Sequence, residues 1–522
     1  MILKKFLKEI QYIMTNNSKS GSFPQFETPP HPKTGENSDQ RDTNVSQSPI
    51  EALTSQAQVI PSESISTNQT NPEQSLKEVK SLPRSNLTRK ILIIVIVLLV
   101  ITSLSLLGIW FMMSRNKEGQ DKKGEIVWWG FQHEAEIYQP LIDKYQQEPP
   151  GIKIIYEKQS PKDYRDRLVG KFAAGIGPDI FEIHNSWPAM FSEDLALLPS
   201  SIMGGDEFNK SFYPVVVSNV TNSKGIIAMP LEFDAITLYI NEDIFASAVK
   251  QPPKTWDDLK ILADPKEDGG FTIKGEKKVI IQSGAALGET ANIDHWPEIL
   301  ALMMYQNRVN PAKPTGASMT DVVTFYNLFR KNGVWNDTLP NSTTVFARGT
   351  LAMYFGPTSR ASEIARLNSD LKFKTVPLPQ LPKVRSTDPD YSYATYWVNA
   401  VWDKSKDKNE AWEFLKYMAQ NETLVRINEN IKKYESVERL YPRPEMNVVF
   451  REHKILASAA SLALDAKSWY LADNTYDGLT GINTKLKDAF AVTLAGGGGE
   501  SSLSKLSGQV KEALNSFSIP LK

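Results

Sequence analysis

A single uncharged apolar run at 91–113 constrains this chain more than any other feature. It is long enough to cross the roughly 30 Å hydrocarbon core of a bilayer, and it lacks the polar face of a helix that packs on a protein core. A cleavable signal peptide would have its apolar core within about the first 30 residues. The run ends in Trp110 and Phe111, and aromatic residues favour the membrane interface. We therefore predict a retained transmembrane helix, a signal anchor.

The segment before this run, 1–90, is predicted to be a disordered polar tail. Between 15 and 80 it is rich in Ser, Thr, Asn, Gln and Pro and has no apolar periodicity, so it cannot bury enough apolar area to offset the entropy of ordering. The first residues, 1–14, could form a short membrane-surface helix, or translation could start at Met14. Basic residues flank the run on both sides, so charge alone does not orient it.

The composition excludes several classes of function. With 59 basic and 60 acidic residues, a net charge of −1 gives no electrostatic case for binding nucleic acid. The chain has no cysteine, which excludes disulfides and thiolate metal sites. Its histidines occur singly, without the spacing of a zinc protease, and they are His31, His133, His184, His295 and His453. We expect no metal and no cofactor.

Strand-like and helix-like patterns alternate after the apolar run. Short apolar runs at 125–129, 152–156 and 179–183 are separated by segments with helical apolar spacing at 134–147 and 164–174. This order predicts a parallel sheet in an α/β fold. In such sheets ligands bind beyond the carboxyl ends of the strands.

This rule directs attention to the loops 130–134 and 184–187, which follow two of the expected strands. Both loops carry aromatic side chains and planar polar groups, which are the kinds of side chain that line concave ligand sites. The ligand-binding candidates from this part of the chain are Trp129, Gln132, Glu134, Asn185 and Trp187. Core packing is the alternative for each tryptophan.

The body resembles the extracellular solute-binding proteins of bacterial ABC importers, in the carbohydrate-type group that includes the maltodextrin-binding protein. The matching features occur in family order at 177–181, 229–241, 253–259, 346–353 and 405–418. The resemblance implies a two-lobed periplasmic-binding-protein-like α/β fold at 124–522, with a hinge and a ligand cleft. It places the first lobe at about 124–234 and 375–449, and the second lobe at about 235–374 and 450–522.

The resemblance also implies further site residues. Asp234 falls where a carboxylate contacts sugar hydroxyls in the maltodextrin branch, and Thr358 stands where that branch has a stacking aromatic residue. This departure weakens any case for maltodextrin specificity. Trp296 or Trp469 could supply the missing aromatic platform. The remaining candidates by position are Gly356 and Arg360 on the second lobe, and Tyr396 and Trp397 on a strand that approaches the cleft.

The resulting hypothesis is a monomeric binding protein that is not an enzyme and lies outside the cytoplasmic membrane, with the tail inside the cell. It would bind a sugar or oligosaccharide and deliver it to the subunits of an ABC permease. One alternative is a ligand-sensing receptor of the same fold without an importer. The other is a membrane-anchored glycoside hydrolase that uses Glu134 and Asp234, whose carboxyl groups would have to lie roughly 5 to 10 Å apart.

Overall fold

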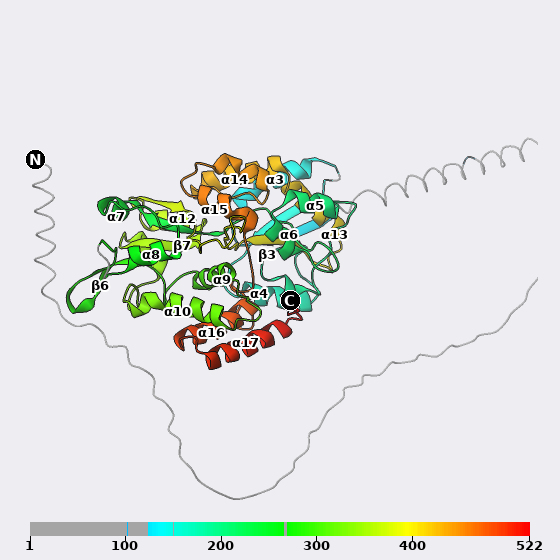
Figure 1. The fold of residues 1–522 in the computed structure, drawn as a ribbon. Helices are drawn as coiled ribbons and strands as arrows, with labels where there is room; N and C mark the ends of the chain where they lie inside the picture. Colours follow the sequence, from blue (N-terminus) through cyan, green and yellow to red (C-terminus); the bar gives the residue numbers. More distant parts are fainter. Residues whose placement is uncertain (1–101, 103–123, 150, 266–268, 522) are drawn as a thin grey trace, which may run out of the picture. The chain divides into compact units, whose positions relative to one another are not determined.

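The computed structural model describes residues 102, 124–149, 151–265 and 269–521 (Figure 1). The expected disordered tail at 1–90 lies outside these residues, as does the expected membrane helix at 91–113 apart from residue 102. Within the described part of the chain, no helix has the length and apolarity needed to span a bilayer.

The first sheet has the strand order β2-β1-β3-β9. Its strands are β1 (Glu125–Gly130), β2 (Lys153–Lys158), β3 (Ile180–His184) and β9 (Trp397–Val401). β1 pairs in parallel with both β2 and β3, whereas β9 returns from far along the chain and pairs antiparallel to β3. The expected alternation of strands and helices at the start of the body is confirmed, because α3 (Ala135–Gln147) and α4 (Tyr164–Ala173) connect the three parallel strands.

The first lobe contains further helices, which are α5 (Gly205–Ser211), α6 (Pro214–Val220), α13 (Lys408–Met418) and α14 (Asn421–Glu435), with the short 3-10 helices η1 (Pro188–Phe191), η3 (Pro444–Phe450) and η4 (Ala463–Asp465). α15 (Ala457–Leu462) buries Ala459 in the core of this lobe and also contacts residues 236–241 and 373–376. α3 shows why such segments fold as helices here: Ile137, Leu141 and Ile142 recur at helical spacing and all three are buried.

The second sheet has the strand order β5-β6-β7-β4-β8. Its strands are β4 (Ile236–Asn241), β5 (Ile273–Lys274), β6 (Ile280–Ala285), β7 (Leu351–Pro357) and β8 (Phe373–Val376). β4 pairs antiparallel with β7 and β8, and β6 pairs in parallel with β7. Every residue of β4 and β7 is buried, so these two strands form the centre of the sheet.

The helices of the second lobe surround this sheet. They are α7 (Glu242–Ser247), α8 (Trp256–Ala263), α9 (Trp296–Gln306), α10 (Ala317–Lys331), α11 (Ser342–Ala347), α12 (Arg360–Leu367), α16 (Ile482–Ala495) and α17 (Glu500–Asn515), with the 3-10 helix η2 (Glu276–Lys278). α10, α16 and α17 lie side by side at the bottom of Figure 1. α8 begins with a capping box, in which the Thr255 hydroxyl accepts the Asp258 N–H and the Asp258 carboxylate accepts the Thr255 N–H.

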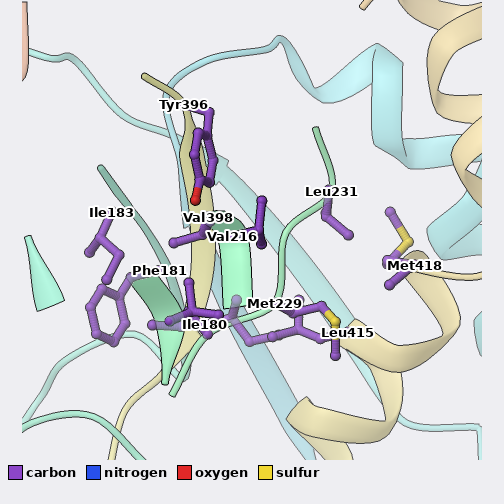
Figure 2. Packing of buried hydrophobic residues seen from close by; sticks show 14 of the residues in the cluster. Ile180, Phe181, Ile183, Val216, Met229, Leu231, Tyr396, Val398, Leu415 and Met418 are labelled. Atoms are coloured by element: carbon purple, nitrogen blue, oxygen red, sulfur yellow. The ribbon is translucent and has the colours of Figure 1, made fainter. Parts of the chain in front are cut away.

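Two separate apolar cores define two lobes. The first draws on residues within 126–235 and 394–466, and the second on residues within 236–393 and 471–514. Figure 2 shows part of the first core, where Ile180 and Phe181 of β3 pack near Val398 of β9 and Leu415 of α13. The two-lobed α/β fold expected from the family resemblance is confirmed.

The cores divide the chain near 235, 393 and 466, whereas the sequence placed the last two divisions at 374/375 and 449/450. The boundary expected at 374/375 lies near 393 instead because β8 pairs with β4, and this pairing holds the chain in the second sheet beyond residue 375. Phe450 and Leu456 pack in the first core, so the return to the second lobe comes later than expected.

Three crossing segments join the lobes and lie side by side. Ala235 pairs antiparallel with Ala394, and Tyr393 pairs in parallel with Lys467. The N–H of Thr395 donates to the carbonyl of Asp234 at 3.1 Å. A few element-terminal residues of this kind are the usual location of a hinge between closing domains.

Candidate functional site

A cavity of about 270 Å³ lies between the two lobes, beside the crossing segments. Its first-lobe wall follows the carboxyl ends of β1 and β3, at Gln132 and His184, and its second-lobe wall begins at the end of β7, at Pro357. This is the position expected for a ligand site in an α/β sheet. Further lining residues are Tyr138, Glu182, Glu232, Asp234, His295, Ser359, Arg360, Ser362, Glu363, Thr395, Tyr396, Trp397, Arg439, Asp473, Asn474 and Tyr476.

Aromatic rings from both lobes meet at one side of this cavity. Trp397, at the start of β9, is contacted edge-on by Phe131, with ring centroids 4.3 Å apart. Across from it, Tyr476 of the second lobe lies nearly parallel, at 27° and 6.4 Å between centroids. Flat apolar surfaces of this kind match the faces of sugar rings.

Tyr476 is held in an unusual backbone conformation. Its φ is +53° and that of the nearby Asn474 is +52°, a left-handed region that a bulky side chain rarely adopts. Such strain persists only where the surrounding structure enforces it, and it is concentrated at functional sites. Tyr476 is also 44% exposed, so its ring is available to a ligand.

Glu182 is the most deeply buried carboxylate of the first-lobe wall, with 7% of its surface exposed. Its Oε2 accepts the backbone N–H groups of Phe131 and Gln132 at 2.8 and 3.1 Å. Burial disfavours the anion and raises the pKa of Glu182 to about 7, although these two hydrogen bonds act in the opposite direction. The loop after β1 is therefore tied to β3 through this side chain.

His133 joins two carboxylates behind the first-lobe wall. Its Nε2 contacts Glu232 and its Nδ1 lies 2.5 Å from Glu435 Oε1. Burial opposes a charge on the imidazole, but the two carboxylates outweigh burial and raise the pKa of His133 to about 9. Arg439 completes the cluster, since its Nη2 donates to Glu435 Oε2 at 2.9 Å. We refer to these four residues as the His133 cluster.

The pKa of His184 is shifted in the opposite direction from that of His133. Burial alone lowers its pKa to about 3, so the imidazole is neutral. Its Nδ1 lies 2.7 Å from the Ser186 hydroxyl and its Nε2 lies 3.0 Å from the Thr395 hydroxyl. It is therefore a neutral hydrogen-bonding group at the end of β3.

On the second-lobe wall, Arg360 is held by two neighbours. Its Nε donates to His295 Nε2 at 2.9 Å, and its Nη1 pairs with Glu363. Because Nε2 of His295 accepts this bond, the ring proton of the neutral imidazole lies on Nδ1. Nδ1 of His295 lies 3.3 Å from Oε1 of Glu298. Arg360 is thus fixed at the first turn of α12, where it lines the cavity.

Asp234 lies at the crossing from the first lobe to the second. Its Oδ1 accepts the N–H and the hydroxyl of Thr358, at 2.8 and 2.7 Å, and its Oδ2 accepts the Ser359 N–H at 3.0 Å. Oδ1 also accepts the N–H of Ala235. The carboxylate therefore binds the backbone just before α12, and Thr358 provides a hydroxyl for it where the resemblance implied an aromatic residue.

Of the twelve ligand-binding candidates chosen from the sequence, the cavity brings together five: Gln132, Asp234, Arg360, Tyr396 and Trp397. Tyr396 is nearly buried, and its hydroxyl donates to Asn219 at 2.8 Å. Trp397 and Arg360 face the cavity from opposite lobes, as a clamp on a solute requires.

The other candidates lie elsewhere. Trp187 and Trp296 belong to the apolar cores, Trp469 packs against the second core, and Trp129 donates its indole N–H to Glu157 at 2.7 Å. The side-chain amide of Asn185 donates to Asn219 and Ser468, and its oxygen accepts the Tyr396 N–H. Glu134 is exposed and pairs with Lys158 at 2.9 Å. Gly356 lies within β7, where an added Cβ would meet the Tyr354 hydroxyl at 2.7 Å.

Sequence reasoning missed several residues that line the cavity, above all Tyr476, Glu182 and His295. Tyr476 follows a polar turn-like segment, Asn474 and Thr475, that carries no regular periodicity. Glu182 lies within a strand, where an alternating pattern would have assigned it to an ordinary sheet face. Only the convergence of distant segments reveals these residues.

Comparison with known proteins agrees with this geometry. Residues 140–429 match the family described as bacterial extracellular solute-binding protein. A protein of Brucella abortus (strain 2308), named only as a binding protein, is 22% identical over 311 residues, which cover 56% of this chain and 71% of that protein.

Two of the solved structures that share the fold illustrate the similarity. An ABC transporter solute-binding protein of Thermotoga lettingae, bound to α-D-tagatose, has a TM-score of 0.56 at 17% identity and covers 75% of this chain and 100% of its own. A cyclo/maltodextrin-binding protein in complex with maltotetraose has a TM-score of 0.58 at 13% identity, covering 76% of this chain and 98% of its own. All of these are binding proteins rather than enzymes. The chain belongs to the bacterial extracellular solute-binding protein family.

Proposed function

We propose that this protein is a membrane-anchored extracellular binding protein that captures a sugar or oligosaccharide between its lobes and delivers it to an ABC permease. The observation that carries the proposal is the cavity lined by aromatic and charged side chains of both lobes. The protein would act as a monomer that presents its two lobes, 124–235 with 394–466 and 236–393 with 467–522, to the permease.

Closure of the lobes supplies the mechanism. A solute that contacts Trp397 on one lobe and Arg360 on the other binds the closed state better than the open state, and this difference in affinity shifts the population. Direct contacts between the lobes support closure as well: the Arg165 Nη1 donates to the Thr480 hydroxyl at 2.9 Å, and Asn483 Nδ2 donates to the Ser186 hydroxyl at 2.8 Å. A permease can then recognise the closed form as the loaded form.

The carboxylates named for a hydrolase do not favour hydrolysis. Glu134 lies outside the cavity lining and pairs with Lys158. Asp234 uses both of its oxygens, since Oδ1 accepts the N–H and the hydroxyl of Thr358 and Oδ2 accepts the Ser359 N–H. A pair of carboxylates across a scissile bond would need one free acid and one free base or nucleophile, so this arrangement supports binding without chemistry.

The apolar run at 91–113 would anchor the body to the outer face of the cytoplasmic membrane, with 1–90 in the cytoplasm. We predict that proteinase K added to spheroplasts removes an epitope tag at the C-terminus and leaves a tag at the N-terminus on a protected fragment. Immunoblotting for both tags measures this, and detergent lysis serves as the control in which both are lost. Loss of the N-terminal tag with a surviving C-terminal tag would reverse the proposed orientation.

The identity of the solute class is tested with the full chain in lipid nanodiscs. A solute that binds only the folded state raises the melting temperature by mass action. We expect at least one member of a panel of mono- and oligosaccharides to raise it, with titration calorimetry giving a single site per chain. Amino acids and dipeptides serve as controls, and a response confined to them would contradict a carbohydrate function.

A further inference from the structure

The cavity carries more negative than positive charge. Five carboxylates line it, and they are Glu182, Glu232, Asp234, Glu363 and Asp473. Arg360 and Arg439 are the cations in the described lining. A buried charge is costly unless another charge or several hydrogen bonds compensate it, so the partners of each carboxylate decide what a solute must provide.

Cations compensate three of the five carboxylates that line the cavity. Glu363 pairs with Arg360, and Asp473 lies 2.5 Å from the Nζ of Lys487. Glu232 contacts the protonated His133 and lies 3.7 Å from the Arg439 guanidinium. In that cluster Glu435 supplies the second negative charge, so its two cations and two anions balance.

The two carboxylates without a cation partner, Asp234 and Glu182, differ in the number of hydrogen bonds that they accept. Asp234 accepts four, which involve both of its oxygens. Glu182 accepts two, and both reach the same oxygen, Oε2. Within the described residues Oε1 of Glu182 has no hydrogen bond and Glu182 has no ion pair, although the side chain is 93% buried and lines the cavity.

No cation among the described residues lies within ion-pair distance of that oxygen, although the charge of His133 lowers the pKa of the Glu182 carboxyl from farther away. Tyr138, Tyr156 and Tyr164 approach it from α3, β2 and α4, and burial raises the pKa of each of them, so they remain neutral. Asn399 is its neighbour on β9 and is uncharged. His133 is already committed to Glu232 and Glu435. Burial raises the pKa of Glu182 to about 7, even though the charge of His133 acts in the opposite direction.

We propose that the solute bears a positive charge that pairs with Glu182, and that the preferred ligand is an amino sugar in its ammonium form. This inference rests on the proposed function and narrows its solute class. An ammonium group provides both a charge and three hydrogen-bond donors, which match the unpaired oxygen of a buried carboxylate. A neutral sugar leaves that carboxylate without a counter-charge.

Titration calorimetry at pH 7.0 on the full chain in nanodiscs compares matched pairs of probes. The pairs are D-glucosamine with D-glucose, D-galactosamine with D-galactose, and D-mannosamine with D-mannose, with the N-acetyl derivatives as neutral controls of similar size. We expect at least one amino sugar to bind at least about tenfold more tightly than its neutral partner, since close charge pairs in a desolvated site are strongly coupled.

The variant Glu182→Gln removes the charge but keeps an oxygen that can accept the Phe131 and Gln132 N–H groups. We expect it to bind the amino sugar and its neutral partner within about threefold of each other. Glu134→Gln is the matched control, because Glu134 lies outside the cavity lining and pairs with Lys158, and it should keep the native preference. Far-UV circular dichroism and the melting temperature establish that both variants are folded.

The outcomes separate this inference from the proposed function. Tight binding of neutral sugars without a preference for the amine would overturn the ligand class and leave the binding function standing. A preference for the amine that survives in Glu182→Gln would overturn the role of Glu182. If no neutral or amino sugar binds, both the ligand class and the proposed carbohydrate function fail.

Discussion

Replacing Trp397 by alanine is expected to weaken solute binding by about 2 kcal/mol, or about thirty-fold in Kd. Trp397 lies at the start of β9, is contacted edge-on by Phe131, and faces Tyr476 from the opposite lobe. Truncation removes the largest aromatic surface of the cavity and the partner of Tyr476. Calorimetry with the solute identified by the panel measures the change.

A matched control separates this effect from general damage to the first lobe. Trp187 contacts Trp397, at 5.4 Å between ring centroids, but it is fully buried in the first core. Its indole N–H has no hydrogen-bond partner within the described residues, so Trp187→Phe removes little besides volume. We expect this variant to lose stability and keep its affinity within about threefold. Equal losses of affinity in both variants would contradict the assignment of Trp397 to the solute.

Replacing His133 by glutamine is expected to lower the free energy of unfolding by about 3 kcal/mol at pH 7. The imidazolium is 2% exposed and contacts both Glu232 and Glu435. Without it, two carboxylates remain beside each other with Arg439 as their shared cation. Urea denaturation of the native protein and the variant measures the loss.

The pH dependence gives a second test of the same cluster. The pKa of His133 rises from the ordinary 6.5 to about 9 on folding, so the folded state binds a proton more tightly than the unfolded state. Its contribution is fully present below pH 6.5 and disappears as the pH rises through 9. The native protein should therefore lose about 3 kcal/mol more than His133→Gln between pH 6 and pH 10.

An exposed ion pair provides the control for this prediction. Lys144 and Glu422 lie 3.7 Å apart and are both more than half exposed. Lys144→Gln should change stability by less than about 1 kcal/mol, because solvent screens such pairs. A loss in His133→Gln no larger than in this control, or identical pH profiles for His133→Gln and the native protein, would contradict the charged state of His133.

The fold could be predicted from the sequence where local patterns decided it. The apolar runs of β1, β2 and β3 and the helical spacing of α3 and α4 depend on residues close together in the chain, and their positions are confirmed to within a few residues. The lobe boundaries near 393 and 466 could not be read in this way. The boundary near 393 depends on the pairing of β8 with β4, a contact between segments far apart in sequence. The boundary near 466 depends on the packing of Phe450 and Leu456 in the first core.

The residues that line the cavity could be predicted only in part, because contacts between distant segments also decide which side chains face it. The ends of strands located Gln132, and the resemblance located Asp234 and Arg360, but side-chain direction decides which residues face the cavity. Trp129 and Trp397 are both on strands of the first sheet, yet only Trp397 lines the cavity. Tyr476 reaches it from a loop whose backbone conformation no sequence pattern indicated.

Closure on a solute is the central claim, and the distance between the lobes tests it most directly. The chain has no cysteine, so Lys171→Cys on α4 and Asp488→Cys on α16 would carry the only two spin labels, one on each lobe. Double electron–electron resonance on the full chain is predicted to show a longer or broader distance distribution without solute and a single shorter distance with it. Identical distributions at saturating solute would contradict the closing clamp.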